Sequence, residues 1–519
     1  MKFMKLVDPF DQTNFILQVL LVLITTTAFS YAFIQINFNG FIDYDSQAFS
    51  AIGYHLLDGK VLYKDVWDAK PFGVYELNSL AIYLFGVEQQ SIWILQLSMS
   101  ALHLVFFFKL IDSITHSRFV ALLSTCFYSI LFYFTPFYQG GNFTEEYAQI
   151  LLIGGVYFGL RYYKEQSLKW IFGSVTLLVS STFFKEPYGL SILPWALFIT
   201  YMIFKRKRHW HLFWVLIFGL LPFFLYFLYL LRTDSTFDYW RHLVYNFSYS
   251  DAQSLPFRDK IIANYGFFKS MLNPYVFSLN MCWLLIVAGL AFAGGRIRIF
   301  LVLFLVEFLL GWISISLTGY QFQHYFMQVL SSFTLLLTLS MFSIVQKLQM
   351  VEWLYSKKIK YLANGIAIII LIWFSGHSIP QAFRSKQSHT LGYTKIVDIV
   401  KSNSIKNKSL FIEDISLFDL YIRSETHSQQ TIPVGFFSYF TVQDEFAIER
   451  IDRYINSFYS HPPTYIVTGV DEGMVRKHHK LKSWFIERYK LVEQENGNRD
   501  SIYLYQNKST LSLPEPFQN

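Results

Sequence analysis

Long apolar stretches separated by short polar turns dominate this chain of 519 residues. The first, Asn14 to Asn37, carries no formal charge over more than the roughly 20 residues that a helix needs to cross a bilayer core. It is too long, and lacks the small-residue cleavage pattern, to be a removed signal peptide. This pattern predicts an α-helical polytopic membrane protein with about eleven transmembrane helices. The ten further stretches are Ser91 to Phe108, Phe119 to Tyr138, Tyr147 to Leu160, Trp170 to Phe184, Tyr188 to Phe204, His211 to Leu231, Val276 to Gly294, Ile299 to Thr318, Phe326 to Gln346 and Tyr361 to Ile379.

Lysine and arginine fall on alternate turns between these stretches. Lys2 and Lys5 precede the first stretch, and the turns 139–144 and 319–323, assigned to the other side, carry no Lys or Arg. By the positive-inside rule the N-terminus is therefore cytoplasmic, and an odd number of crossings places the C-terminal segment outside. The other cations on the cytoplasmic side follow the second, fourth, sixth, eighth and tenth stretches: Lys109, Arg118, Arg161, Lys164, Lys169, Lys205, Arg206, Lys207, Arg208, Arg296, Arg298, Lys347, Lys357, Lys358 and Lys360.

Composition agrees with a location in a membrane, because 53% of the residues are hydrophobic and 15% are charged. The net charge of +7 is spread over membrane turns, which argues against a basic face for nucleic acid. Cys126 and Cys282 are the two cysteines, and both lie in predicted spans, so no disulfide is expected outside the membrane. Abundant Ile, Phe, Tyr, Lys and Asn with little Cys indicate a bacterial plasma membrane.

Three regions lie outside the membrane on this topology: residues 38–90, 232–275 and 380–519. The first contains two predicted helices, Ser46 to Leu57 and Pro71 to Phe85. The second of these helices is apolar but only ~15 residues long, so we expect it to lie along the membrane interface rather than to cross. If it crossed, the alternation of cations further along the chain would be inverted.

Residues 380–519 are predicted to form a soluble extracytoplasmic α/β domain, attached to a transmembrane module that comprises residues 1–379. Thr394 to Ser402 and Ala447 to Ser460 have helical patterns. This segment shows neither a phosphate-binding glycine loop nor the spacing of a zinc site. The predicted strands are Ser409 to Ile415, Tyr465 to Val470, Tyr489 to Glu493 and Ser501 to Tyr505.

The first outer loop reads FIDYDSQAFSAIGYHLLDGKVLYKDVWDAKPFG and is rich in charge. Asp43 and Asp45 follow the first span directly, and Asp65, Asp68 and Lys70 come later in the same loop. Each carboxylate taken alone is compatible with an ordinary solvated loop charge. However, Asp43 and Asp45 alternate across one residue, so an extended backbone would point both side chains the same way at the outer edge of the bilayer.

Two further outer turns carry ionisable side chains. GGNFTEEYA contains Asn142, Glu145 and Glu146, which suit either a solvated helix start, stabilised by capping and the helix dipole, or a functional carboxylate. FFKEPYG contains Lys185 and Glu186 on the side of the membrane that has few cations. Lys185 suits either an internal ion pair with Glu186 or Glu145, or contact with a phosphate.

A histidine–tyrosine pair and one acidic residue inside a span complete the candidates. QFQHYF places His324 and Tyr325 at the outer start of the tenth span, where an aromatic anchor at the membrane interface is the common explanation. Glu307 lies in the middle of the ninth span, so it is either a site residue or a group protonated or hydrogen-bonded within the bundle.

The first outer loop resembles that of the C-type glycosyltransferase (GT-C) superfamily, which includes the protein O-mannosyltransferases and the lipid A aminoarabinose transferases. The similarity lies in an acidic residue after the first span, a helix ending at glycine, and the elements Tyr-Lys-Asp and Asp-x-Lys-Pro. It implies that Asp45, or Asp43 beside it, is the catalytic carboxylate. Relatives usually have an Asp-Glu pair, whereas Ser46 follows Asp45 here, which leaves the choice open. The resemblance also implies that Glu145 faces this carboxylate.

The reaction implied is transfer of a sugar from a polyprenyl-phosphate donor to the hydroxyl of an envelope glycan, lipid or protein, with inversion at the anomeric carbon. The carboxylate would accept the hydroxyl proton. Lys70, Lys185 and Arg232 would stabilise the lipid phosphate that leaves. No resident cofactor is implied, and a divalent cation bridging Asp45, Glu145 and the phosphate stays open. The residues assigned to the substrate cavity are Asp68, Glu146, His324 and Tyr325.

Two alternative functions remain at this stage. A secondary transporter could use Asp45, Glu145 and Glu307 as ion sites, although the sequence lacks the repeated halves common in transporters. A catalytically inactive membrane protein could bind a lipid-linked sugar without turnover, and Ser46 in place of the usual acid is compatible with that.

Overall fold

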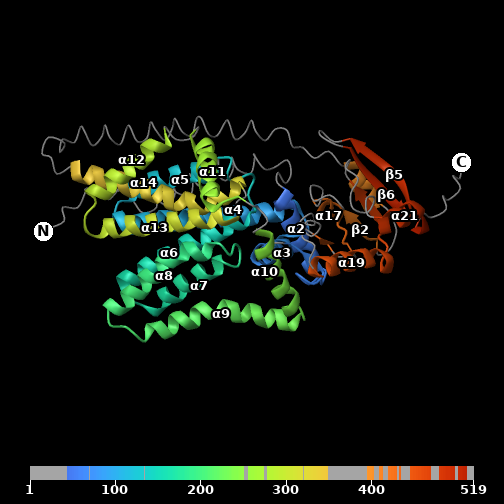
Figure 1. Cartoon of the computed structure of the whole chain (residues 1–519), viewed down its shortest axis with the longest axis horizontal. Helices are drawn as coiled ribbons and strands as arrows, with labels where there is room; N and C mark the ends of the chain where they lie inside the picture. Colours follow the sequence, from blue (N-terminus) through green and yellow to red (C-terminus); the bar gives the residue numbers. More distant parts are fainter. Residues whose placement is uncertain are drawn as a thin grey trace. The chain divides into compact units, whose positions relative to one another are not determined.

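A computed structural model describes most of the helical part of the chain and much of its C-terminal segment (Figure 1). The predicted spans Asn14 to Asn37 and Tyr361 to Ile379, the candidate Asp43, and the predicted domain boundary at residue 379 lie outside the described residues. These predictions stay predictions. The described residues are 44–68, 70–133, 135–250, 255–273, 278–318, 321–348, 394–402, 408–412, 419–428, 432–433, 445–468, 479–496 and 501–510.

The chain forms two compact units, each described here by itself. Unit 1 takes its described residues from Leu97–Tyr226 and Gln253–Ser385. Unit 2 takes them from Asn37–Gln96, Phe227–Ala252 and Lys386–Asn519, so both loops that the sequence predicts to lie outside contribute to the unit that contains the C-terminal segment.

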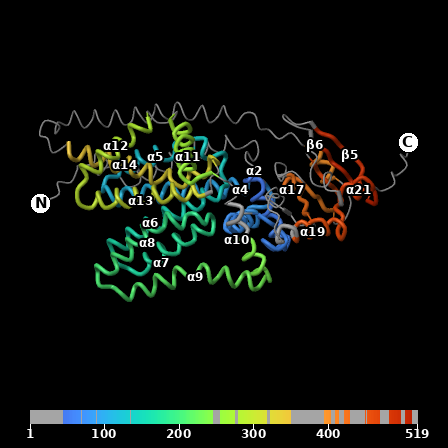
Figure 2. The backbone as a smooth tube through the Cα atoms, viewed as in Figure 1, coloured from blue at the N-terminus to red at the C-terminus, as the bar shows by residue number. Residues whose placement is uncertain are grey.

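The regular elements among the described residues of unit 1 are helices, and each predicted apolar stretch in that part of the chain forms one. Helices α6, α7 and α8 pack side by side, and α14 packs against α5, α6, α12 and α13 (Figure 2). The helix α11 was not predicted from the sequence. The first turns of α4 and the last turns of α9 belong to unit 2. The elements are α4 (Gln89–Thr115), α5 (Arg118–Tyr133), α6 (Thr144–Glu165), α7 (Leu168–Ser181), α8 (Tyr188–Lys205), α9 (His211–Arg232), α11 (Phe257–Leu272), α12 (Leu279–Phe292), α13 (Gly295–Thr318), the 3-10 helix η1 (Gln323–Phe326) and α14 (Met327–Leu348).

Five helices among the described residues are long and apolar enough to cross a membrane: 90–115, 188–205, 211–232, 295–317 and 323–348. Their burial differs widely. In the most apolar part of α14, 83% of the residues are buried, whereas in α9 only 11% are buried although the helix is apolar on all sides. An apolar surface that none of the described residues covers is stable in a hydrocarbon environment, so within this part of the chain α9 has the character of a lipid-facing helix.

Small residues set the closest approaches between helices. A Cβ atom added to Gly289 of α12 would lie 2.2 Å from the Cβ of Ser340 on α14. Only hydrogen fits there. Such contacts let two backbones approach closely, which is how helices associate by van der Waals packing in membranes.

Unit 2 begins with two packed helices, α2 (Tyr44–Leu57) and α3 (Gly73–Phe85), which confirm the two helices predicted in the first outer loop. A Cβ atom on Gly53 of α2 would lie 2.7 Å from the backbone nitrogen of Ser79 on α3, so glycine permits this contact. Close to this contact between the two helices, Ser50 of α2 donates a hydrogen bond to Oδ1 of Asn78 on α3 at 3.1 Å.

The C-terminal part of unit 2 is an α/β fold, as predicted. Its four-stranded sheet has the order β2-β4-β6-β5, in which β2 and β4 are parallel and the other neighbours antiparallel. The strands are β2 (Leu410–Ile412), β4 (Tyr465–Thr468), β5 (Tyr489–Asn496) and β6 (Ser501–Asn507). The other elements here are α16 (Thr394–Ser402), α17 (Asp419–Ser424), α19 (Glu445–Ser460), α21 (His479–Arg488) and the 3-10 helix η4 (Lys508–Thr510).

Two elements of the outer loops join this fold. The short strand β1 (Val66–Trp67) of the first outer loop pairs in parallel with β3 (Ile432–Pro433). Helix α10 (Thr236–Ser250), which the sequence did not predict, contributes side chains that bond to α19.

Candidate functional site

The turn that precedes α6 holds its backbone in an unusual conformation. Gln139, Gly140, Gly141 and Asn142 all have positive φ, and the values for Gln139 and Asn142 are 45° and 62°. A side chain disfavours this conformation, so the surrounding structure must hold it in place. The turn is therefore a fixed platform at the start of α6.

Glu146 supports this turn. One carboxylate oxygen accepts a hydrogen bond from the backbone N–H of Asn142 at 2.9 Å, and the other accepts one from the Tyr138 hydroxyl at 2.9 Å. Glu146 is fully buried. Its role matches that of a helix-capping carboxylate, but in a buried setting rather than the solvated one that the sequence also allowed.

Glu145 and Lys185 form a buried ion pair. Lys185 Nζ lies 2.7 Å from Glu145 Oε1, and the two side chains are 10% and 1% exposed. Lys185 Nζ also lies 4.2 Å from the centre of the Tyr325 ring, a cation–π contact. The internal ion pair that the sequence allowed for Lys185 thus forms with Glu145, which was one of its two possible partners. The other, Glu186, is exposed.

His324 is held beside this pair by stacking and by the same turn. Its ring stacks on Phe143 with centroids 4.3 Å apart, and its Nδ1 lies 2.9 Å from Gln139 Oε1. His324 is buried, so it is more than a surface anchor. Unit 1 therefore brings together the predicted residues Glu145, Glu146, Lys185, His324 and Tyr325.

Glu307 does not belong to this group of contacts. Its carboxylate accepts a hydrogen bond from Trp195 Nε1 at 2.6 Å inside the bundle, and it is buried. The sequence allowed this hydrogen-bonded state as one explanation for an acidic residue within a span.

In unit 2, Asp45 lies in the first turn of α2. This corrects the expectation of an extended backbone there, because the helix begins at Tyr44. A carboxylate in the first turn of a helix is stabilised by the helix dipole. Asp45 is half-buried.

Asp68 and Tyr75 form a buried polar pair in unit 2. The Tyr75 hydroxyl donates a hydrogen bond to Asp68 Oδ2, and both residues are buried. Burial, then the Asp68 carboxylate, and to a smaller extent Asp45 raise the pKa of Tyr75 well above its ordinary value. Tyr75 therefore keeps its proton, and Asp45 lies within electrostatic reach of it.

The other two predicted phosphate contacts also belong to unit 2. Lys70 is half-buried, and its backbone carbonyl accepts a hydrogen bond from the Tyr63 hydroxyl at 3.0 Å. Arg232 is exposed at the C-terminal end of α9. Among the residues that the structure describes, no group of three or more His, Cys, Asp or Glu side chains is placed to hold a metal ion.

Three tyrosines that the sequence did not single out organise these clusters. Tyr75 binds Asp68, Tyr138 binds Glu146, and Tyr188 donates to the backbone carbonyl of Glu145 at 3.0 Å. The chain contains 35 tyrosines, so residue type alone could not single these out. The one available signal was that Tyr138 and Tyr188 adjoin turns already rich in charge.

No protein-family model matches the sequence. No curated protein matches it either. Among solved structures, ArnT from Cupriavidus metallidurans bound to undecaprenyl phosphate matches with a TM-score of 0.62 at 13% sequence identity, covering 96% of this chain and 99% of that chain. The apo structure of the same protein matches with a TM-score of 0.61 at 12% identity and the same coverage.

This chain has the ArnT fold. The predicted resemblance to the GT-C superfamily, and within it to a lipid A aminoarabinose transferase, is thereby confirmed at the level of the fold. The ArnT fold extends over almost the full length of both chains, so the likeness includes the C-terminal segment as well as the helical part.

Proposed function

We propose that this protein transfers a sugar from a polyprenyl-phosphate donor to an acceptor hydroxyl at the outer surface of a bacterial plasma membrane. The observation that carries the proposal is the ArnT fold over 96% of the chain, since that ArnT structure contains undecaprenyl phosphate. The acceptor is an envelope glycan, lipid or protein. The membrane topology that we propose has eleven spans, a cytoplasmic N-terminus and the C-terminal segment outside.

The chemistry begins at a carboxylate of the first outer loop. Asp45, or Asp43 beside it, accepts the proton of the acceptor hydroxyl as its oxygen attacks the anomeric carbon. The bond between that carbon and the phosphate oxygen breaks, and polyprenyl phosphate leaves with the bonding electrons. Attack from the face opposite the phosphate inverts the anomeric carbon, by analogy with inverting glycoside hydrolysis.

Cations stabilise the phosphate as its negative charge grows. In this proposal Lys70, Lys185 and Arg232 supply that charge. The proposed role of Lys185 is supported by its burial, because a cation held by one carboxylate and one aromatic ring keeps little of its water of hydration. Electrostatic interactions in such surroundings are stronger than in water. Asp68, Glu146, His324 and Tyr325 line the substrate cavity in the same proposal.

The test is mass spectrometry of envelope glycans and lipids from cells that carry the wild-type chain, Asp45→Asn or Asp43→Asn. We expect one modification to disappear with the variant that removes the base, because an amide cannot accept the proton at neutral pH. Equal amounts of inserted protein, checked by immunoblot of membranes, are the control. Unchanged modification in both inserted variants would rule out the proposed base.

Purified protein distinguishes the alternative functions. Transfer to an added acceptor supports the enzyme, whereas substrate-driven uptake into vesicles would indicate a transporter. Binding of undecaprenyl phosphate without transfer would indicate an inactive relative. Repeating the assay after EDTA treatment tests whether a divalent cation takes part.

A further inference from the structure

The stretch from Tyr63 to Lys70, called the 63–70 loop below, is closed on itself. The Tyr63 hydroxyl donates to the Lys70 carbonyl at 3.0 Å, and the Tyr63 backbone N–H donates to the Val66 carbonyl at 2.8 Å. The first of these bonds joins the two ends of the loop, and the second closes a turn within it. The backbone of Lys70 is therefore tied to the Tyr63 side chain.

Trp67 anchors this loop in the hydrophobic core of the C-terminal segment. Its side chain is fully buried and belongs to a cluster that includes Phe411, Tyr454 and Phe458. Pairing of β1 with β3 fixes its backbone next to Pro433. The next residue, Asp68, bonds instead to Tyr75 of α3. Neighbouring residues of the loop are therefore fixed to two different structures.

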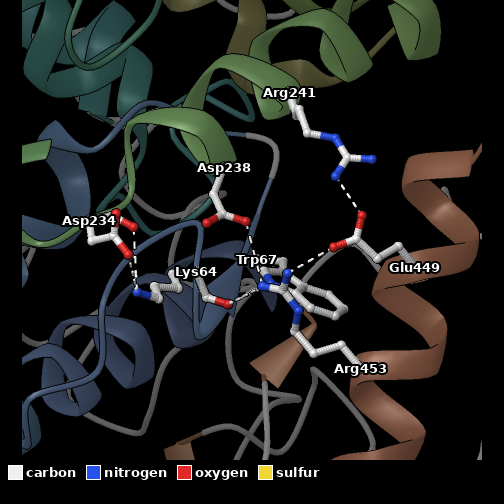
Figure 3. Close-up of polar contacts among 7 residues, drawn as sticks. All are labelled: Lys64, Trp67, Asp234, Asp238, Arg241, Glu449 and Arg453. Carbon is white, nitrogen blue, oxygen red and sulfur yellow. Dashed lines mark hydrogen bonds and ion pairs between the residues drawn. The ribbon is translucent and has the colours of Figure 1, made fainter. Parts of the chain in front are cut away.

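Arg453 of α19 holds the loop from outside the core. It donates to the Lys64 carbonyl at 3.5 Å, and its guanidinium lies 3.5 Å from Asp238 and 2.9 Å from Glu449 (Figure 3). The same Lys64 carbonyl accepts a hydrogen bond from Trp67 Nε1 at 3.1 Å.

Helix α10 completes this network. Lys64 Nζ lies 3.3 Å from Asp234, just before α10, and Arg241 of α10 pairs with Glu449 (Figure 3). The network thus joins both outer loops to α19. It lies entirely within unit 2.

We propose that Trp67 and Arg453 are positioning residues through which the C-terminal segment holds Lys70 ready for the donor phosphate. This inference rests on the proposed function, in which Lys70 contacts that phosphate. It gives the C-terminal segment a part in the use of the donor. A loop fixed before the ligand arrives loses less conformational entropy on binding, so donor affinity depends on these contacts.

The experiment measures binding of undecaprenyl phosphate to the full-length protein in detergent by native mass spectrometry. Arg453→Gln is expected to weaken binding roughly tenfold, since a loop that is no longer held in place loses more conformational entropy when the ligand binds. Lys70→Met should weaken binding too, and adding Arg453→Gln to Lys70→Met should change it little more, because Arg453 acts through Lys70. Lys482→Gln, which removes an exposed charge of α21, should bind like the wild type.

Hydrogen exchange of the ligand-free protein provides a second measurement. Arg453→Gln and Trp67→Phe, which keeps an apolar ring but removes the indole N–H, should speed exchange at the Tyr63 amide without affecting β5 and β6. Wild-type protein that fails to bind undecaprenyl phosphate would contradict the proposed function. If the wild type binds undecaprenyl phosphate, the positioning role alone would be overturned by either of two results. One is an Arg453→Gln variant whose binding and exchange equal those of the wild type, and the other is a double variant whose losses in binding are additive.

Discussion

Lys185 is a buried cation whose charge is balanced by one carboxylate and one aromatic ring. Its position on the side of the membrane with few cations predicted an ionic partner, and Glu145 is that partner. The sequence could not choose between Glu145 and Glu186, because the choice depends on how α6 and the turn before α8 pack. The proposed role of Lys185 requires that the pair opens toward a phosphate.

Breaking this pair from one side should be costly. Lys185→Met and Glu145→Gln should each lower the free energy of unfolding by about 3 kcal/mol, because either change leaves a buried charge or polar group without its partner. The double variant should lose clearly less than the sum of the two. Unfolding in mixed detergent micelles measures this, and additive losses would mean that the two groups do not interact.

His55 has a defined tautomer in the structure. Its Nδ1 lies 2.7 Å from the Ala51 carbonyl, to which it must donate, and its Nε2 accepts from the Ser428 backbone N–H at 2.9 Å. A second proton on Nε2 would face that N–H. Burial, aided by nearby positive groups, lowers the pKa of His55 from 6.5 to about 3.

The stability of unit 2 should therefore fall in acid. His55 takes up a proton more readily in the unfolded state than in the folded state. The stability that neutral His55 contributes is therefore fully present above pH 6.5 and is lost as the pH falls from 6.5 toward 3. The loss at pH 5 is about 2 kcal/mol. Unfolding midpoints of wild type and His55→Gln between pH 7 and pH 5 measure it. A slope that is the same in both proteins would exclude His55 as its source.

At the scale of elements, apolar length predicted the helices well and the short strands partly. The pattern from Tyr188 to Phe204 became α8 almost residue for residue. By contrast, β1 has two residues, and its partner β3 is far away in the sequence, so no local pattern could predict their pairing. Helix α10 was missed because it is too short and too polar to stand out as an apolar stretch, and its pairing with α19 through Asp238 and Arg241 leaves no local pattern.

The contact between α2 and α3 depends on a residue without a side chain. Gly53→Ala should destabilise the protein by about 1–3 kcal/mol, because the added methyl group would overlap the α3 backbone at Ser79. It should also weaken any activity that depends on Asp45, since α2 carries that residue. Thermal unfolding and the glycan assay measure the two effects.

The matched control is Gly266→Ala in α11, where a Cβ atom meets no other atom within 4 Å. This change should be neutral or slightly stabilising, because alanine favours a helix over glycine. Equal behaviour of the two variants would show that α2 and α3 are not in close contact.

At the scale of the whole molecule, the alternation of cations predicts which turns lie outside. In a background without Cys126 and Cys282, we expect cysteine at Gln321 or Lys482 to react with a membrane-impermeant maleimide in intact cells. Cysteine at Lys207 should react only after the cells are opened. All three positions are exposed.

Labelling on opposite sides for Gln321 and Lys482 would invalidate the topology. The fold could be predicted from the sequence at the level of a helical membrane module with a C-terminal α/β segment. The grouping of the two loops with that segment could not be predicted. It depends on long-range contacts such as that of Trp67 with core residues more than 300 positions further along the chain.

The pairing of β1 with β3 has a consequence for biogenesis. Ribosomes add roughly 5–20 residues per second, so Trp67 emerges on the order of half a minute before Ile432 is made. During that interval a large aromatic side chain waits without its final surroundings. Synthesis of the last segment would then complete a structure begun by the first, and truncated chains would leave this tryptophan open to proteases and chaperones.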